Sequence, residues 1–316
     1  MKAFVGALVF MWLTAICGYG QARIPLDGRG KVKSSSPTER PQASTLYTQA
    51  DTVRYRELVV KAYRSLQKDS FLQAKSCFEQ ALKAIPRMDS NAEVCYELGQ
   101  LEEREGHYAK AVDCYTRAVK RNSHYLKAYL RRGGMYLLLG DDMTAVKDFD
   151  NVISIDNTNN DAYFFRGCAY ANMGRYELAA KDLSLLLQRN AADERTLYTM
   201  ALVEIQQNKL EDALLRMNGL IWRYPKETLY YKARAEINEK RGTTDMAEKD
   251  WQQAVALAPA DADIAERYAQ FLLRQNRRAD AMKVIDGVER SGVPSGEVSA
   301  LRQRIKRYRP PVAGTK

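Results

Sequence analysis

The chain has 316 residues, of which 46% are hydrophobic and 28% charged, and this ordinary composition excludes wholesale disorder and a protein that crosses a membrane many times. Its 49 Lys and Arg outnumber its 39 Asp and Glu, for a formal net charge of +10, so nucleic acid, an anionic membrane and an acidic partner are the first binding candidates. Two histidines and five cysteines leave little material for a metal site or a histidine-based active site.

The first 22 residues have the pattern of a secretory signal peptide. Lys2 supplies the basic start, an uncharged and largely apolar run follows, and small residues stand at Gly18, Gly20 and Ala22. We therefore expect cleavage after Gly20 or Ala22. The mature protein is then exported, and we expect it to be periplasmic or associated with the outer envelope.

Two other interpretations of this N-terminal segment stay open. An uncleaved membrane anchor needs about 20 apolar residues, and the strongly apolar part of this segment is shorter. A lipoprotein signal places a small residue directly before its cysteine, but the bulky Ile16 precedes Cys17, so we do not expect lipidation at Cys17. No later segment is apolar enough to span a bilayer.

Residues 23–54 follow, and we expect a flexible tether there. The stretch is rich in Gly, Pro, Ser and charged residues, and its apolar residues show no helical or strand period. Such a composition cannot bury enough apolar surface to fold by itself.

A period of 34 residues governs the sequence from about residue 55 onwards. One alanine marks each repeat: Ala74, Ala111, Ala145, Ala179, Ala213, Ala247 and Ala281. Five residues before each alanine stands Gly, Asn or Asp, which tolerate the left-handed backbone of a tight turn. Four residues after it stands a large apolar side chain, and twelve before it a Gly or Ala that lets two helices approach closely. Each repeat is therefore predicted to be a helical hairpin that buries its apolar face by stacking on its neighbours.

This pattern, in stretches such as GHYAKAVDCYTRAV and WQQAVALAP, resembles the tetratricopeptide repeat family. The resemblance implies an all-α fold, a right-handed superhelical solenoid of about seven helical hairpins with a C-terminal capping helix. The units are residues 55–88, 92–125, 126–159, 160–193, 194–227, 228–261 and 262–295, with three extra residues, 89–91, after the first. We expect one continuous array.

Residues 296–316 are predicted to be the capping helix and a basic tail. Ser295 can cap this helix, and Val298, Leu301, Ile305 and Tyr308 recur at helical spacing before a pair of prolines. We expect this apolar stripe to cover the exposed face of the last hairpin, because terminal caps of this kind keep repeat arrays soluble.

Catalytic and metal-binding motifs are missing from the sequence. It contains no GxxxxGK[ST], no GxGxxG after a strand, no GxSxG and no HExxH, so we expect no catalytic residue, no cofactor and no enzyme activity. His107 and His124 are expected on the solvated surface. Without a CxxC pair or a histidine at ligand spacing we expect no metal, and the mature chain's cysteines are predicted to be buried free thiols: Cys77, Cys95, Cys114 and Cys168.

The first helix of every unit lines a concave groove in this family, and the second, fifth, ninth and twelfth positions should face it. In units two to five these positions are largely apolar, and we assign them to a partner-binding groove: Tyr96, Leu130, Gly134, Leu137, Phe164, Cys168, Tyr198, Leu202 and Ile205. In units six and seven they are charged or polar: Lys232, Glu236, Glu239, Asp263, Glu266 and Gln270. An apolar centre rimmed by charge is typical of a protein-binding surface. The alternative for the apolar residues is packing against neighbouring helices.

Lys127 and Arg131 are candidate anion contacts. Relatives that bind chaperone C-termini use Lys, Arg and Asn as a clamp around a carboxylate, and these two residues match half of such a clamp. The other clamp positions hold Val59, Tyr63 and Glu97, and Glu97 would repel a carboxylate. We therefore do not expect a chaperone clamp.

The sequence favours a non-enzymatic protein–protein interaction scaffold of the bacterial cell envelope that binds a partner peptide or helix in the concave groove. The alternative is an envelope tether whose basic tail holds anionic membrane or cell-wall polymer through Arg302, Arg304, Lys306, Arg307 and Arg309. A third option is an enzyme subunit or a regulator that acts through a partner. The partner's identity and the oligomeric state stay open.

The excess of basic residues lies at the two ends of the chain. Residues 1–50 carry six basic and two acidic groups, residues 301–316 carry six basic groups and no acid, and residues 51–300 carry 37 of each. The repeat body is therefore neutral, and nucleic acid is not expected as a partner.

Overall fold

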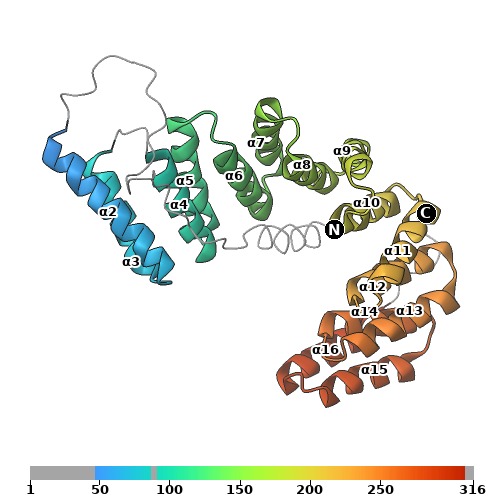
Figure 1. Ribbon diagram of the computed structural model, residues 1–316. Coiled ribbons are helices and arrows are strands. Elements are labelled where there is room, and N and C mark those ends of the chain that lie inside the picture. The colour runs from blue at the N-terminus through green and yellow to red at the C-terminus, as the bar shows by residue number, and fades with distance from the viewer. Residues whose placement is uncertain (1–46, 87–90, 310–316) are drawn as a thin grey trace. The chain divides into compact units, whose positions relative to one another are not determined.

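The computed structural model describes residues 47–86 and 91–309, and within them the fold is all-α, with fifteen helices and no strand (Figure 1). The helices are α2 (Gln49–Gln67), α3 (Phe71–Ala84), α4 (Asn91–Arg104), α5 (Tyr108–Arg121), α6 (Leu126–Leu139), α7 (Asp142–Ile155), α8 (Asn160–Asn172), α9 (Tyr176–Arg189), α10 (Glu194–Gln206), α11 (Leu210–Arg223), α12 (Thr228–Arg241), α13 (Thr244–Leu257), α14 (Ala262–Arg274), α15 (Arg278–Arg290) and α16 (Ser295–Arg307). The predicted signal peptide, tether residues 23–46 and tail residues 310–316 lie outside the described residues.

Consecutive helices pack as antiparallel hairpins, as α4 with α5 and α12 with α13 do. The turn of every hairpin contains one residue with φ between 54° and 80°, and these are the Gly, Asn and Asp of the repeat: Asp69, Gly106, Gly140, Gly174, Asn208, Gly242 and Asn276. A positive φ strains most side chains, so this column of the sequence fixes where each hairpin turns. The prediction of an all-α solenoid of hairpins is confirmed.

The core of each hairpin is formed by the alanine column and the large apolar column, both of which are fully buried. All seven repeat alanines are 0% exposed, and so are Tyr115 and Phe149. The small residues predicted to allow close approach do so: a Cβ added to Gly99 or Gly133 would lie 2.4 Å or 2.6 Å from the ring of Tyr115 or Phe149. A larger residue at either glycine would push the two helices apart.

The first helix begins earlier than the sequence period suggested. Helix α2 starts at Gln49, so the expectation that a tether continues to residue 54 is wrong. Thr48 and Asp51 form a capping box, in which the Asp51 amide donates to the Thr48 hydroxyl (3.1 Å) and the Thr48 amide donates to the Asp51 carboxylate (2.9 Å). These bonds satisfy amides that otherwise lack partners at a helix start.

The chain divides into two compact units, one ending at Asp182 and the other beginning at Leu183. The boundary falls within α9. A hairpin in a repeat array contacts only its neighbours, so no core residue ties distant hairpins together and such arrays divide readily.

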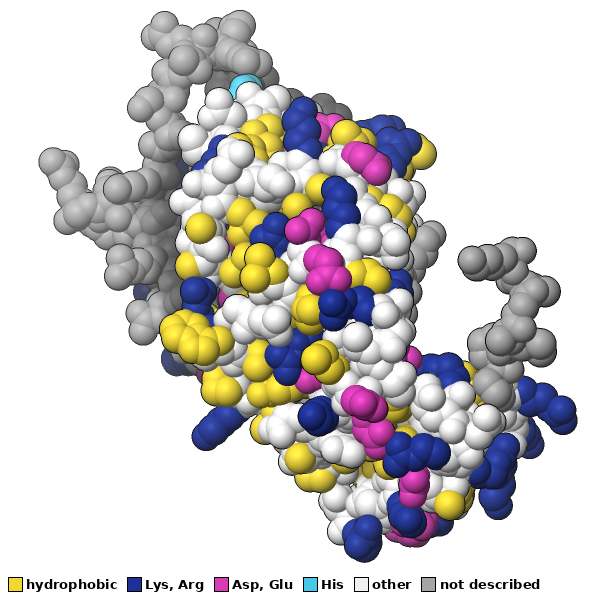
Figure 2. Space-filling view, turned by 90° about the vertical axis from the view of Figure 1, so that its right-hand side faces the viewer, with side chains coloured by type: hydrophobic (Ala, Val, Ile, Leu, Met, Phe, Trp, Pro, Cys, Tyr) yellow, Lys and Arg dark blue, Asp and Glu magenta, His cyan; other side chains and the backbone are white. Residues whose placement is uncertain are grey.

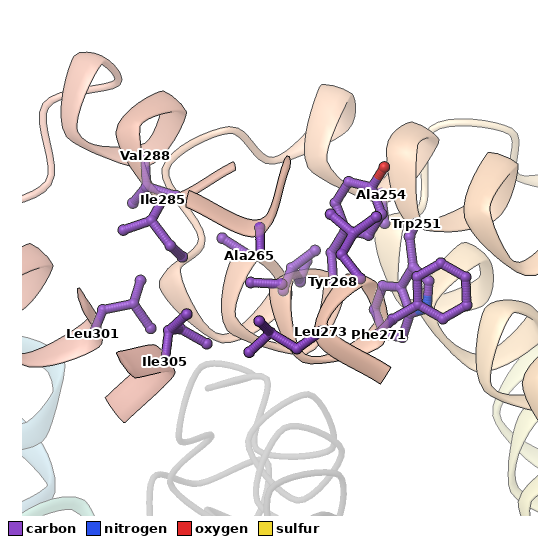
Figure 3. Close-up of a cluster of buried hydrophobic side chains, with 14 of the residues drawn as sticks. Trp251, Ala254, Ala265, Tyr268, Phe271, Leu273, Ile285, Val288, Leu301 and Ile305 are labelled. Carbon is purple, nitrogen blue, oxygen red and sulfur yellow. The ribbon is translucent and has the colours of Figure 1, made fainter. Parts of the chain in front are cut away.

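The second unit ends with the predicted capping helix, α16. Figure 3 shows Leu301 and Ile305 of this helix beside Ile285 and Val288 of α15, and all four are at most 1% exposed. The predicted Ser295 cap is wrong, because Ser295 is the first helical residue and Pro294, which offers no side-chain hydrogen bond, takes the cap position.

Basic and acidic residues balance over the repeat body. On the face drawn in Figure 2, Lys and Arg side chains lie intermixed with Asp and Glu, in keeping with a neutral repeat body. None of the described helices combines the length and the apolar character that crossing a membrane requires.

Candidate partner-binding faces

Within each unit the first helices of neighbouring hairpins contact one another, as α6 with α8 and α10 with α12 do. We call these helices the first-helix face, made of α2, α4, α6 and α8 in the first unit and α10, α12 and α14 in the second. Most of the side chains predicted to line a groove here are buried instead. Buried are Tyr96, Gly134, Leu137, Phe164, Cys168, Tyr198 and Ile205, while Leu130 and Leu202 are partly exposed. Seven of the nine residues are therefore buried by packing, which was the alternative to a partner-binding groove.

Two of the three aromatic residues among them, Tyr96 and Tyr198, contact rings outside their own helix. The Tyr96 ring lies 5.7 Å from Tyr115 and 5.2 Å from Tyr125, centroid to centroid. Tyr198 lies 5.5 Å from Tyr230 of the following hairpin. Phe164 lies edge-on to Phe165, its neighbour on the same helix, at 5.5 Å, and is 1% exposed. All three rings are therefore buried within the fold rather than presented on its surface.

Two carboxylates stand on the first-helix face of the first unit. Glu93 is exposed, and Glu97, one turn later on α4, is partly exposed. Burial, reinforced by the Glu93 carboxylate, raises the pKa of Glu97 to about 7, and the Lys127 charge opposes this rise only in part. Both carboxylates also help to keep the pKa values of Tyr63 and Tyr125 above the usual range for tyrosine, although burial is the larger cause.

The two candidate anion contacts separate in the structure. Arg131 is buried, and its guanidinium lies 3.1 Å from the Glu103 carboxylate on α4. The Tyr115 hydroxyl donates to the same carboxylate at 2.7 Å. Lys127 is exposed. Arg131 is therefore wrong as an anion contact, since its charge is already paired, and Lys127 stands beside acidic Glu97 rather than in a basic clamp.

The charged positions of the second unit form ion pairs between neighbouring first helices. Lys232 of α12 pairs with Asp263 of α14, and Glu236 of α12 lies 3.0 Å from Arg267 of α14. Glu239 pairs with Arg274 of α14, while Glu266 lies 2.7 Å from Arg304 of α16 and accepts a bond from Gln270. This row of ion pairs links α12, α14 and α16 on one face.

The basic tail is part of the folded chain as far as Arg309. Arg302 lies 2.7 Å from both Asp286 and Glu289 on α15. With Arg304 paired to Glu266, two of the five tail residues are committed to the repeat body. Lys306, Arg307 and Arg309 are exposed.

One group of potential metal ligands occurs among the described residues, at the turn of the second hairpin. It comprises Glu102, Glu105 and His107. The Lys75 ammonium lies 2.8 Å from Glu102 and 2.7 Å from Glu105, so the carboxylates already have a counterion.

His107 and His124 are exposed, as predicted. The four cysteines of the described residues are buried and free, also as predicted, and burial raises the pKa of Cys95 and Cys114.

A recurring Arg–Asp pair was not predicted from the sequence. Arg132 with Asp148, Arg166 with Asp182 and Arg234 with Asp250 each join the two helices of one hairpin by paired hydrogen bonds of 2.6–3.2 Å. Each pair spans sixteen residues. The signal was therefore present as an arginine column and an aspartate column in register with the repeat.

Residues 92–125 and 161–193 each match a model of the tetratricopeptide repeat. The human DnaJ homolog subfamily C member 7 is 26% identical over 176 residues, which cover 51% of this chain and 36% of that protein. The chain thus spans less than two thirds of that relative's length.

Two solved structures share the fold. A tetratricopeptide repeat protein from Parabacteroides merdae superposes with a TM-score of 0.68 at 21% identity, over 80% of this chain and 99% of its own. PilW, described as a widely conserved type IV pilus biogenesis factor, gives a TM-score of 0.56 at 17% identity, over 69% of this chain and 97% of its own. At these identities the likeness shows the fold alone.

Proposed function

The chain is a tetratricopeptide repeat protein, and from this premise we propose that it is a non-enzymatic scaffold of the bacterial cell envelope that binds a partner peptide or helix on its first-helix face. Proteins of this family generally mediate protein–protein interactions. A stack of hairpins presents a surface formed before the partner arrives, so the entropic cost of ordering falls mainly on the partner.

The binding surface we propose differs from the apolar groove expected from the sequence. It is the first-helix face of the first unit, where Glu93, Glu97, Lys127 and Leu130 are accessible. The observation that carries the proposal is the position of Glu97, a partly buried carboxylate on the same helix face as the Glu93 carboxylate, and this burial and repulsion raise its pKa to about 7. A Lys or Arg side chain of a partner would supply the missing charge and restore the pKa of Glu97 towards its ordinary range.

The envelope location rests on the N-terminal pattern of residues 1–22, which lie outside the described residues. The likeness in fold to PilW is compatible with it. Export would place the partner in the same compartment. Expression with the N-terminal segment intact, followed by fractionation and sequencing of the mature N-terminus, tests this part. A chain that keeps Met1 and stays in the cytosol would contradict it.

The binding surface is tested with a displayed library of short random peptides selected on the purified chain. We expect the selected peptides to carry Lys or Arg. Their affinity for the Glu97→Gln variant should be about tenfold lower than for the wild-type protein, a loss of about 1.4 kcal/mol. Replacing the key lysine of the peptide by norleucine should cause the same loss, and both changes together should cause no more than one alone.

A matched control is Glu79→Gln, which removes an exposed carboxylate from α3 of the same unit. This variant should bind the selected peptides like the wild-type protein. Selected peptides without a basic residue, or binding that is indifferent to Glu97, would rule out the proposed surface.

The alternative function is an envelope tether that holds anionic polymer or membrane. The observation in its favour is the exposure of Lys306, Arg307 and Arg309 at one end of the chain. Each such cation contributes about 1 kcal/mol near an anionic membrane surface. The tether predicts that replacing all three by Gln releases the protein from phosphatidylserine vesicles, while the peptide-binding scaffold predicts unchanged peptide affinity.

A further inference from the structure

An apolar stripe is exposed on α11, the second helix of the hairpin α10–α11. Leu215 is 73% exposed and Trp222 is 84% exposed, and Trp222 is the most exposed of the large hydrophobic side chains in the described residues. They stand seven residues apart, so they lie two turns apart on the same side of the helix. This side lies opposite the buried stripe of α11, which consists of Ala213, Met217, Leu220 and Ile221.

Gly219 lies between the two apolar side chains, in the middle of the helix. A Cβ added there would meet nothing within 4 Å, so no contact within the chain requires a glycine. Glycine inside a helix costs about 1 kcal/mol relative to alanine. The exposed side of α11 therefore carries two large apolar knobs with a gap between them, and that gap allows another backbone to approach closely.

The two ends of α11 carry charges of opposite sign. Asp212 is exposed in its first turn beside Glu211, whose carboxylate pairs with Arg241 of α12, while Arg223 ends the helix and Lys226 follows, both exposed. Two such helices side by side and parallel would bring like charges together. When antiparallel, they bring the acidic end of each beside the basic end of the other.

We propose that a second copy of this chain docks here, with the two α11 helices antiparallel about a two-fold axis that passes beside Gly219. In this arrangement Leu215 of each copy meets Trp222 of the other, because the two residues lie at nearly equal distances on either side of the axis. The absence of side chains at Gly219 lets the two helices approach closely at the crossing. A single isologous helix pair buries a small area, so the dimer should form with micromolar affinity.

Sedimentation equilibrium of the purified full chain over a concentration series tests the proposal. We expect a monomer–dimer equilibrium for the wild-type protein. Leu215→Glu and Trp222→Lys, each at an exposed position, should weaken the dimer at least tenfold without changing the thermal unfolding midpoint. Leu72→Glu replaces an equally exposed leucine of α3, 79% exposed, and should dimerise like the wild-type protein.

Mixing the two α11 variants distinguishes the antiparallel pair from any other use of this stripe. The dimer contains two contacts between residue 215 of one copy and residue 222 of the other. In a mixed dimer one of these contacts keeps the native Leu215 and Trp222, and the other joins the introduced carboxylate to the introduced ammonium group. We therefore expect the mixture to form a dimer that neither variant forms alone. A wild-type chain that stays monomeric, variants that dimerise unchanged, or a mixture that stays monomeric would each overturn the proposal.

A cross-link provides an independent readout. Gly219→Cys places a thiol near the two-fold axis of the dimer, and mild oxidation should give a disulfide-linked dimer. Gln253→Cys occupies the equivalent exposed position on α13 and should remain monomeric. Equal cross-linking of the two variants would show that collisions, rather than a docked pair, bring the thiols together.

Discussion

The guanidinium of Arg131 on α6 lies 3.1 Å from the carboxylate of Glu103 on α4, and both side chains are largely buried. The same carboxylate accepts the hydroxyl proton of Tyr115 from α5. The pair therefore joins two neighbouring hairpins through three helices. The charge of Arg131, a candidate anion contact in the sequence, therefore serves the stacking of the repeats.

Removing the Arg131 side chain should lower the stability of the fold. Arg131→Ala leaves the Glu103 carboxylate in a partly buried position without its cation, and we expect a loss of about 2–4 kcal/mol in the free energy of unfolding. Urea denaturation measures this loss. Lys127→Ala, at an exposed position four residues earlier, should change the stability by less than about 0.5 kcal/mol. Equal stabilities of the two variants would mean that the Arg131–Glu103 pair contributes nothing to stacking.

Stability should fall as pH rises through the acidic range because of Glu97. Its pKa is about 7 in the folded chain, against an ordinary value of 4.5. Between these values the folded state keeps a proton that the unfolded state has lost, so folding becomes less favourable with each rise in pH. We expect a difference of up to about 3 kcal/mol between pH of about 4.5 and about 7.5, levelling off above.

The Glu97 contribution is isolated by comparing wild type with Glu97→Gln in urea denaturation across this range. The variant lacks the titrating group, so the difference in stability between the two proteins should grow with pH up to about 7. Glu79→Gln is the control, since its carboxylate is exposed. A difference that does not vary with pH would show that burial leaves Glu97 unperturbed.

The small residues of the repeat are required where a ring crosses them. Gly133→Ala places a Cβ 2.6 Å from the Phe149 ring, so one helix has to shift, and we expect a loss of about 1–3 kcal/mol. Gly287→Ala, inside α15 with nothing within 4 Å, should instead stabilise the chain by up to about 1 kcal/mol. Thermal unfolding of both variants checks the opposite signs.

The capping helix should be needed for the second unit to stay folded and soluble. Leu301 is 0% exposed against the last hairpin, and Leu301→Ala should cost about 2–5 kcal/mol. Lys306→Ala, on the exposed side of the same helix, should leave stability unchanged. If denaturation cannot distinguish the two variants, α16 does not cap the array.

Deleting residues 301–316 to test the tether would remove this cap. Replacing the three exposed tail cations is therefore the better test of the tether.

The hairpins were predictable because their determinants are local and repeat. A left-handed residue at each turn, an alanine that admits a close helix and a large side chain one turn later recur with little change from Asp69 to Ile285. The start of α2 was missed because its Thr48–Asp51 capping box lies before the first full period. The repeat period continues across Asp182, where the chain divides into its two compact units.

The apolar groove was wrong for a different reason. Helical spacing gives the direction in which a side chain leaves its helix, but burial depends on what the next hairpin places there. Tyr198 is 1% exposed and packs against Tyr230, which belongs to the following repeat. Trp222, which has the same apolar character, is left in solvent because it leaves α11 on the side opposite the buried stripe.

The sequence by itself therefore determined the repeat, the turn of each hairpin and the column of alanines at its centre, since these depend on backbone conformation and side-chain size within one unit. Only the tertiary structure decided which charges are paired and which apolar residues are buried or left in solvent. Arg131 and Glu103 stand 28 residues apart, and Lys232 and Asp263 stand 31 apart. Such contacts form between hairpins, where stacking distance and angle decide which side chains meet.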